Sequence, residues 1–203
     1  MNLVLLAVEI AGLAVLGFLV GAVNPATLLA RAFGRDLRTS GSGNPGAANA
    51  GRVLGRRWGA VVLALDVAKA YVPTLLVLMA VGRLAALVTG LAVVLGHVFS
   101  PFLRGRGGKG VACAAGAILA VDPVVALAAL VVFGVVLPFV PAIGEASVVA
   151  TLALVVIGVL GAVGVLPLVD PLVGAWLVVL ALLVLSRHRR NVAEWGARLR
   201  GRR

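Results

Sequence analysis

The sequence has very few charged residues, one cysteine and two histidines. Charged side chains make up 12% of its 203 residues, against about 25% in an average soluble domain. So small a polar share argues against a water-soluble globule, and the high apolar share excludes a disordered chain. The single cysteine, Cys113, excludes a disulfide scaffold and any multi-cysteine metal site. With so few histidines as well, we expect no metal and no cofactor.

Apolar residues are what the chain has in abundance. They make up 62% of the sequence, in runs long enough to cross a hydrocarbon core, which needs about 20 residues per helix. We therefore expect an all-α integral membrane protein with seven transmembrane helices, forming a single membrane-embedded domain over residues 1–203. The expected spans are residues 3–30, 58–81, 84–102, 110–121, 123–140, 146–165 and 172–186.

Two of these boundaries rest on local capping signals. Asn24-Pro25 interrupts the first apolar run. Asp122-Pro123 splits a stretch that is long for one helix, because aspartate is a good N-cap and proline fits the first helical turn. The resulting helix 110–121 is short for a membrane crossing.

The basic residues indicate the topology. Three segments hold 16 of the 18 lysines and arginines: residues 31–57, 103–110 and 187–203. Seven spans place all three on one side of the membrane, whereas six spans would place the tail opposite the other two. The positive-inside rule therefore favours seven, with the N-terminus outside and the C-terminus in the cytoplasm. The net charge of +11 is first a topology signal, and we expect no nucleic-acid partner.

The first basic segment contains a glycine-rich motif. Gly41, Gly43 and Gly46 match G-x-G-x-x-G, but the dinucleotide fingerprint requires a preceding strand, and this loop follows a membrane helix. Glycines still allow backbone N–H groups to converge on an anion, and Arg52 adds a cation. The composition suits a phosphate group at the membrane surface, and a flexible solvated loop is the alternative. The further polar side chains of this segment are Ser42, Asn44 and Asn49.

The second and third basic segments carry similar signals. Lys109 stands among glycines, including Gly108, but Gly110 takes the place of the Ser or Thr of a P-loop. It could clamp an anion or simply form a basic turn. In the tail, His188 and Asn191 are three residues apart and share a helical face, although a histidine at the membrane surface often has no catalytic role. Asp66 and Lys69 have the same spacing inside a span, where an internal ion pair is expected.

These motifs resemble those of the bacterial acyl-phosphate:glycerol-3-phosphate acyltransferases, the PlsY family. The similar segments are Ser40-Gly-Ser-Gly-Asn-Pro-Gly-Ala-Ala-Asn49, Leu65-Asp66-x-x-Lys69, Gly96-His97-x-Phe99-Ser100-x-Phe102-Leu103, Gly107-Gly-Lys-Gly-Val-Ala112 and Arg187-His188-x-x-Asn191. Together they run from about residue 20 to residue 192.

The resemblance implies a seven-helix enzyme of phospholipid synthesis in the bacterial inner membrane, with its active site on the cytoplasmic face. Such enzymes transfer an acyl group from acyl phosphate to the 1-hydroxyl of glycerol 3-phosphate, giving lysophosphatidic acid and phosphate. The implied partners are these substrates, membrane lipids and the enzyme that supplies acyl phosphate. The implied catalytic residues are Ser42, His188 and Asn191, and the implied phosphate-binding residues are Ser42, Gly43, Asn44, Asn49, Arg52, Gly108, Lys109 and Ser147.

The chain also departs from the family pattern. Ala48 and Cys113 replace threonines, and the glutamate that normally follows the third motif is missing, since the chain reads Gly201-Arg202-Arg203. A paralogue without catalytic activity, or with another substrate, is the alternative. Glu194 or Glu145 could replace the missing carboxylate; we expect Glu194, because it lies in the same segment as the third motif. The general base could be His188 or a substrate phosphate.

Overall fold

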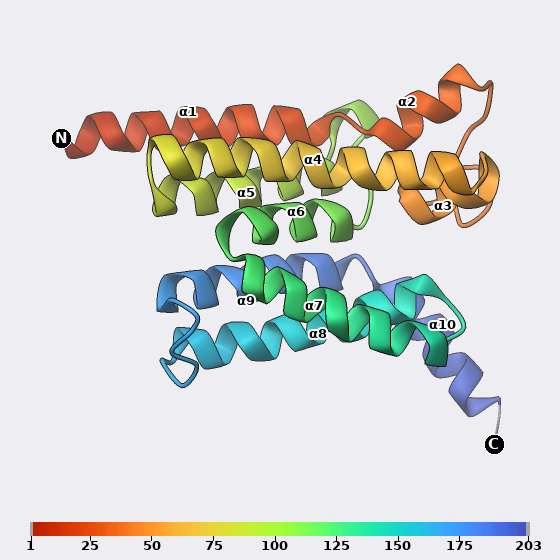
Figure 1. Ribbon diagram of the computed structural model, residues 1–203. Coiled ribbons are helices and arrows are strands. Elements are labelled where there is room, and N and C mark those ends of the chain that lie inside the picture. The colour runs from red at the N-terminus through yellow and green to blue at the C-terminus, as the bar shows by residue number, and fades with distance from the viewer. Residues whose placement is uncertain (1, 202–203) are drawn as a thin grey trace. The chain divides into compact units, whose positions relative to one another are not determined.

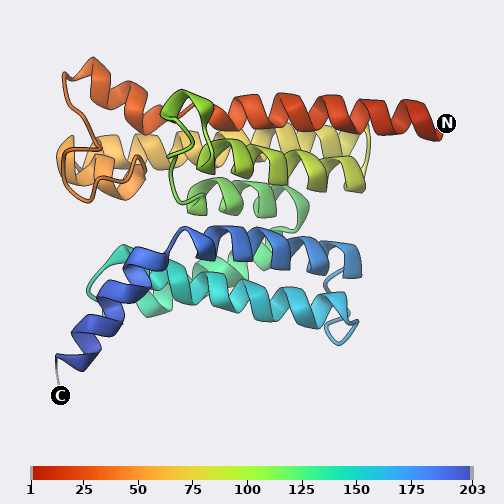
Figure 2. The same ribbon diagram turned by 180° about the vertical axis from the view of Figure 1, so that it is seen from behind.

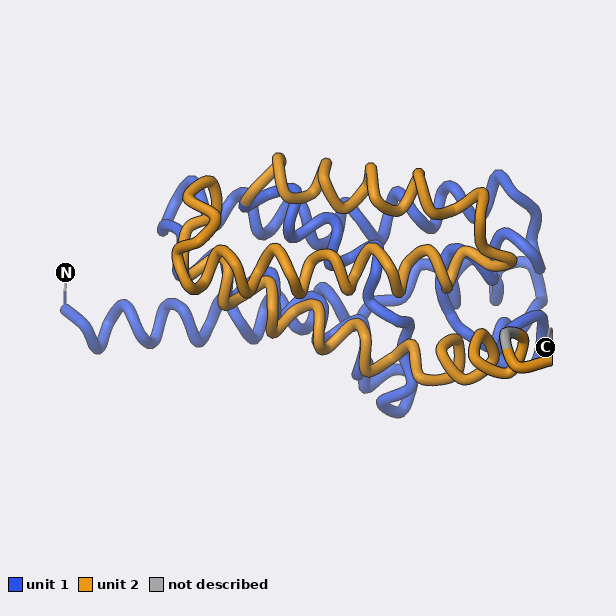
Figure 3. Tube along the Cα trace, turned by 90° about the horizontal axis from the view of Figure 1, so that it is seen from below, with its two compact units in different colours: residues 1–121 blue, residues 122–203 orange. Residues whose placement is uncertain are grey.

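The computed structural model describes residues 2–201, and every regular element in that range is helical (Figure 1). The α-helices are α1 Leu3–Ala22, α2 Pro25–Ala32, α3 Ala47–Val53, α4 Arg56–Ala80, α5 Arg83–Val98, α6 Val111–Val121, α7 Pro123–Val136, α8 Ile143–Ala162, α9 Pro171–Ser186 and α10 Arg189–Arg200, and the 3-10 helices are η1 Pro101–Leu103 and η2 Leu137–Phe139. They fall into two compact units, Met1–Val121 and Asp122–Arg203 (Figure 3). Arg202 and Arg203, which stand where the family motif has its glutamate, lie outside the described residues.

The first unit is built on close helix contacts at glycines. α1 lies along α5, and α4 packs against both α5 and α6 (Figures 1 and 2). A Cβ atom at Gly17 would lie 3.0 Å from the carbonyl oxygen of Thr89, and one at Gly21 would overlap the backbone of Val93. These two glycines form a G-x-x-x-G face on α1. Small residues in this spacing let helix backbones approach one another, as they commonly do in membranes.

The second unit uses the same device. α8 packs against α9, and α7 against α8. A Cβ atom at Gly158 would lie 2.9 Å from the carbonyl oxygen of Gly174. The chain then bends by 64° between α9 and α10, and α10 returns to contact α8. This bend places the third motif at a helix junction.

Large apolar side chains are exposed along many of these helices, as lipid-facing helices require. Among residues 2–201, four helical segments are long and apolar enough to span a membrane, or five if α9 and α10 form one bent span. α6 has 11 residues and is therefore only about 16 Å long, against about 30 Å of hydrocarbon. The all-α membrane class is confirmed, while the seven-span count and the orientation of the termini stay predictions.

The capping signals predicted the helix breaks correctly. The Thr27 N–H donates to Asn24 Oδ1 at 2.8 Å, and the Val125 N–H donates to Asp122 Oδ1 at 3.0 Å. One element was missed: residues 31–57 were expected to be a loop, but they contain α3. This short helix depends on tertiary packing, because a Cβ atom at Gly59 of α4 would lie only 2.7 Å from the Gly51 Cα of α3.

Candidate active site

Asn49 organises the first glycine-rich loop. Its side chain, on α3, is 1% exposed. Asn49 Oδ1 accepts a hydrogen bond from the Ser42 N–H at 2.8 Å, and Nδ2 donates to the carbonyl oxygens of Leu37 and Ser40, both at 3.0 Å. Gly41 between them has φ +61°, and a Cβ atom there would overlap Asn49 Oδ1. Asn49 therefore shapes the loop from inside, and its amide is already occupied by backbone partners.

The outer side of the same loop carries the groups available to a ligand. Ser42 and Arg52 are exposed, and Gly43 and Asn44 are partly exposed. Within residues 2–201 the guanidinium of Arg52 donates to no protein group. The base of the loop is fixed by Asn24, whose Nδ2 donates to the Pro45 carbonyl oxygen at 2.9 Å. The fixed base and exposed rim are what an anion-binding loop requires.

The second loop folds back onto the end of α5. The N–H groups of Gly107 and Gly108 donate to the carbonyl oxygens of Val98 and His97, at 3.0 and 3.2 Å. A Cβ atom at Gly108 would overlap the His97 imidazole, so only glycine fits against this ring. The loop ends at Gly110, where φ is +86°, and half-buried Lys109 lies between these fixed points. Gly108 thus positions the lysine.

Arg38 joins the two loops directly. Its Nη2 donates to the carbonyl oxygen of Leu103 at 2.7 Å and to that of Arg106 at 3.4 Å. The two glycine-rich segments of the first unit therefore lie together. The sequence offered no signal for this role, because Arg38 is one of several arginines in a basic segment and its partners lie far along the chain.

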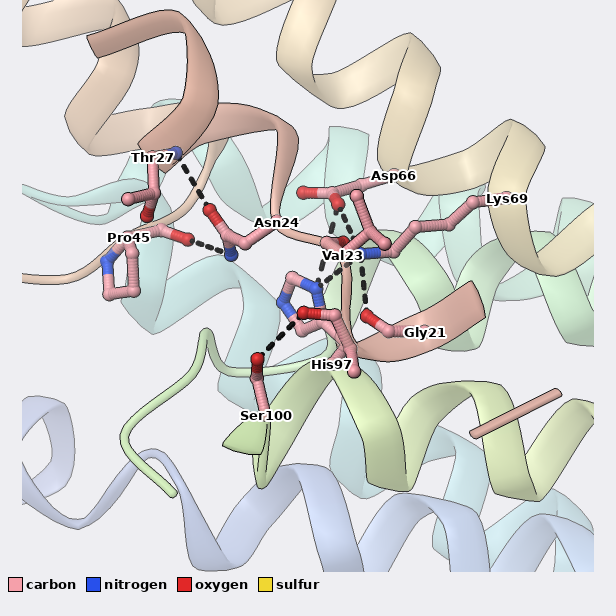
Figure 4. Close-up of polar contacts among 10 residues, drawn as sticks. Gly21, Val23, Asn24, Thr27, Pro45, Asp66, Lys69, His97 and Ser100 are labelled. Carbon is pink, nitrogen blue, oxygen red and sulfur yellow. Dashed lines mark hydrogen bonds and ion pairs between the residues drawn. The ribbon is translucent and has the colours of Figure 1, made fainter. Parts of the chain in front are cut away.

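A buried polar cluster lies beneath the first unit's loops (Figure 4). Lys69 Nζ lies 3.0 Å from Asp66 Oδ1, so the internal pair expected from the sequence is confirmed. The same ammonium donates to the carbonyl oxygens of Gly21 and Val23, at 3.1 and 2.7 Å, and lies 2.9 Å from His97 Nδ1. It thereby fixes the end of α1 to α4 and α5.

The contact with Lys69 also favours one tautomer of His97. Because an ammonium can only donate, this contact is a hydrogen bond when His97 Nδ1 accepts and the ring proton lies on Nε2; Asp66 Oδ1 also lies 3.5 Å from Nδ1. The donor atoms of Asp66, His97 and Cys113 all lie within 4.8 Å of one another, a grouping that could hold a metal ion. The sequence did not suggest it, since these residues are far apart in the chain. Lys69 already places its own cation against two of the three ligands.

The second unit holds the third motif at the junction of α9 and α10. His188 is fully buried, and its Nδ1 lies 2.9 Å from the Val184 carbonyl oxygen. A carbonyl oxygen only accepts, so Nδ1 carries the proton and Nε2 is the basic nitrogen of the neutral ring. His97 and His188 thus hold opposite tautomers, and the basic nitrogen of His97 already accepts a hydrogen bond from Lys69.

Asn191 and Ser147 occupy defined positions in the same unit. The Asn191 amide contacts Gly144 so closely that a Cβ atom there would overlap it. Ser147, one turn into α8, donates its hydroxyl to the Ile143 carbonyl oxygen at 2.9 Å and is 5% exposed. The side-chain amide of Asn191 is therefore positioned against the beginning of the helix that carries Ser147.

The two candidate glutamates lie in different surroundings. Glu194 is an exposed residue that pairs with Arg190 at 2.7 Å, one turn away. Glu145, two residues before Ser147, is fully buried and pairs with Arg198 of α10. That Glu194 replaces the missing carboxylate stays a prediction; in the structure its carboxylate turns to a solvent-exposed arginine. The carboxylate that ties the C-terminal helix to α8 is Glu145.

The fold and the comparisons with known proteins together assign the chain to the membrane acyltransferases of phospholipid synthesis. More narrowly, the glycerol-3-phosphate acyltransferase family model matches residues 11–197, and the chain belongs to that family. The family resemblance of the motifs is thus confirmed.

Individual relatives support the same assignment. The glycerol-3-phosphate acyltransferase of Geotalea daltonii is 38% identical over 86% of this chain and 88% of its own length. That of Aquifex aeolicus is 37% identical over 89% of this chain and 92% of its own.

Solved structures show the same fold. The crystal structure of PlsY, described as an integral membrane glycerol 3-phosphate acyltransferase in its glycerol 3-phosphate form, superposes with a TM-score of 0.83. Identity is 33%, over 93% of this chain and 92% of that one. The lysophosphatidic acid form of the same protein gives a TM-score of 0.82.

Proposed function

We propose that this protein transfers a fatty acyl group from acyl phosphate to the 1-hydroxyl of glycerol 3-phosphate, releasing lysophosphatidic acid and phosphate. The observation that carries the proposal is the first loop, in which Asn49 fixes the backbone from inside while Ser42 and Arg52 remain exposed on the rim. A structural neighbour has been solved in forms with glycerol 3-phosphate and lysophosphatidic acid, which are the proposed acceptor and product.

We assign the phosphate groups of the substrates to the loops of the first unit. The backbone of Ser42, Gly43 and Asn44 and the guanidinium of Arg52 are suited to bind the oxygens of a phosphate group. Lys109 supplies a second cation at the rim of the other loop. In this assignment Asn49 and Gly108 act as positioning residues, because their contacts go to the Ser42 N–H and the His97 ring.

The reaction itself needs little covalent help from the protein, since a mixed anhydride is already activated. The 1-hydroxyl oxygen attacks the acyl carbonyl carbon, the bond between that carbon and the phosphate oxygen breaks, and phosphate leaves. The hydroxyl proton passes to a base. The neutral tautomer of His188, with Nε2 as the basic nitrogen, supports its assignment as that base. A phosphate oxygen of a substrate is the alternative acceptor.

The departures from the family pattern are compatible with activity. An unpaired carboxylate near Ser147 would oppose an anionic substrate, but Glu145 is paired with Arg198. Cys113 is fully buried in α6, so its side chain is not positioned to contact a substrate directly. Asn191 and Ser147 are assigned to positioning glycerol 3-phosphate.

We further propose the seven-span topology with its three basic segments in the cytoplasm, and hence an enzyme of the bacterial inner membrane that receives acyl phosphate from a separate acyl-phosphate-producing enzyme. Apolar helices of spanning length and the segregation of basic residues support this placement.

Which acyl donor the protein uses tests this proposal. Purified protein is supplied with glycerol 3-phosphate and either acyl phosphate or an acyl thioester, and the position of the new ester is determined by mass spectrometry. We expect 1-acyl product from acyl phosphate alone. Product from the thioester alone would assign another donor, and no product from either donor would favour the non-catalytic paralogue.

A further inference from the structure

A second basic site lies in the first unit, beside the loops assigned to the reaction. A cleft of about 340 Å³ is formed by α2, the turn that follows it, and η1 with Arg104. This volume lies within the range of ~300–1,000 Å³ typical of small-ligand sites. None of the residues assigned to acyl transfer lines it.

One wall is the end of α2 and its closing turn. Gly34 has φ +64°, its N–H donates to the Arg31 carbonyl oxygen at 3.0 Å, and the Arg35 N–H donates to that of Ala30 at 2.8 Å. This is the Schellman arrangement of a helix C-terminus. It brings Arg31 of the last helical turn and Arg35 beyond the turn to the same cleft.

The opposite wall contains a strained arginine. Arg104 has φ +53°, and it is the only non-glycine residue with positive φ among residues 2–201. A side chain in this conformation is strained, whereas glycine adopts it freely. Glycine follows at once as Gly105. The arginine at the less favourable position therefore places a guanidinium in the cleft at a conformational cost.

The charges in the cleft are unbalanced. Arg38 closes its base by donating to the Leu103 carbonyl oxygen, and Asp36 Oδ1 accepts from the Arg38 N–H at 2.8 Å. The other three lining arginines are exposed, and within residues 2–201 none of them is paired with a carboxylate. Three guanidiniums against one carboxylate leave a site for an anion.

The position of the cleft relative to the apolar helices indicates the kind of anion. One apolar segment of spanning length ends at Ala32 and another at Leu103, so residues of the cleft lie at the ends of both. Phe102, 66% exposed, lines the same cleft. An aromatic ring beside guanidiniums, at the level where spans end, matches the boundary between acyl chains and head groups.

We propose that this cleft binds the phosphate head group of an anionic membrane lipid, with guanidinium forks on the phosphate oxygens and Phe102 against the glycerol and first acyl carbons. The bound lipid bridges the two walls. Because one wall continues into the loop of Gly41–Gly46 and the other into the loop of Gly105–Gly110, the lipid ties the entries of both loops together.

The test uses the full chain in neutral detergent. Dioctanoyl phosphatidylglycerol is titrated against the purified protein, and binding is followed by the thermal unfolding midpoint and by native mass spectrometry. Dioctanoyl phosphatidylcholine and inorganic phosphate are titrated in parallel. We expect saturable binding of phosphatidylglycerol, about tenfold or more tighter than binding of either comparison ligand. A tenfold difference is what the loss of one charge-assisted hydrogen bond corresponds to. Equal binding of inorganic phosphate would overturn the lipid assignment, and equal binding of phosphatidylcholine would overturn the anion preference.

Matched variants locate the site. Arg31→Gln and Arg104→Gln each weaken phosphatidylglycerol binding by about tenfold, whereas Arg57→Gln, at an exposed arginine outside the cleft, leaves it within about twofold. Arg104→Gly separates binding from folding, because glycine relieves the positive φ: the lipid-free protein unfolds at the same or a higher temperature, yet lipid binding is weakened as in Arg104→Gln. Unchanged binding in both Arg104 variants, or an equal loss in Arg57→Gln, would reject the cleft as the site.

Discussion

Lys69 Nζ lies 2.9 Å from Nδ1 of His97, and this contact links the polar side chains of α4 and α5 beneath the glycine-rich loops. The same ammonium holds Asp66 and two carbonyl oxygens at the end of α1. The His97 ring in turn lies against Gly108 of the second loop. One buried cation therefore supports the backbone from which both loops of the first unit arise.

Loss of this cation is expected to destabilise the first unit. Lys69→Met leaves the Asp66 carboxylate buried without its cation, a change of about 3–5 kcal/mol that lowers the unfolding midpoint by about 10 °C. The matched control is Arg190→Met, which breaks an exposed pair with Glu194 and should shift the midpoint by about 1 °C or less. Thermal unfolding in detergent measures both, and equal shifts would show that the buried pair has no special weight.

Asn49 and Ser42 should be separable by mutation. Asn49→Ala removes the three hydrogen bonds that its amide makes to the first loop, so we expect faster amide hydrogen exchange over residues 40–44 and a loss of about 100-fold in kcat/KM. Ser42→Ala leaves these bonds in place, since Ser42 contributes only its N–H, and should slow turnover without faster exchange. Faster exchange in Ser42→Ala, or none in Asn49→Ala, would contradict the division between positioning and contact.

The tautomer of His188 predicts a specific effect of its replacement. In His188→Asn the amide Nδ2 can still donate to the Val184 carbonyl oxygen, but the basic nitrogen is lost. We expect kcat to fall by about 10²–10⁴-fold while KM and the unfolding midpoint change little. Steady-state kinetics beside a thermal scan measures this split. A near-normal kcat would indicate that a substrate phosphate, and not His188, accepts the hydroxyl proton.

Glu145 and Arg198 should behave as a coupled pair. Arg198→Ala leaves a fully buried carboxylate unpaired and is expected to cost about 3–5 kcal/mol of unfolding free energy. The double variant Glu145→Gln with Arg198→Ala should recover part of that loss, because the buried charge is gone. Glu194→Gln serves as the exposed control. A double-mutant cycle on unfolding midpoints measures the coupling, and strict additivity would mean that the two side chains do not interact.

The proposed topology has a direct test. Single cysteines at Thr39 and Gly105, in a Cys113→Ala background, are labelled with a membrane-impermeant maleimide in intact cells and in inverted vesicles. We expect both sites to react only in inverted vesicles, because both basic segments are proposed to be cytoplasmic. Reaction of either site in intact cells would refute the orientation.

Local chemistry made much of the fold predictable. Asn24 and Asp122 are helix caps, and capping depends on residues within one turn. The glycine-rich loops were recognisable because positive φ at Gly41 and Gly110 depends on the residue itself. Helix α3 was not recognisable, since its stability comes from the approach of Gly51 to Gly59 rather than from its own sequence.

The positioning residues of the site could not be predicted for the same reason. Arg38 reaches the Leu103 carbonyl oxygen across 65 positions, and Arg198 reaches Glu145 across 53. Nothing in the neighbourhood of either arginine marks its partner. Sequence spacing favoured Glu194 because it lies in the same segment as the third motif. It could not show that Glu145, in another helix, is the buried carboxylate that pairs with Arg198.

The stoichiometry of a single reaction tests the central claim most directly. Purified protein is incubated with acyl phosphate and glycerol 3-phosphate, and lysophosphatidic acid and inorganic phosphate are quantified over time beside Arg52→Ala and Lys109→Ala. The account predicts that the two products appear in equal amounts, and that each variant either abolishes turnover or raises the apparent KM for a phosphorylated substrate. Release of phosphate without lysophosphatidic acid, or unchanged kinetics in both variants, would contradict it.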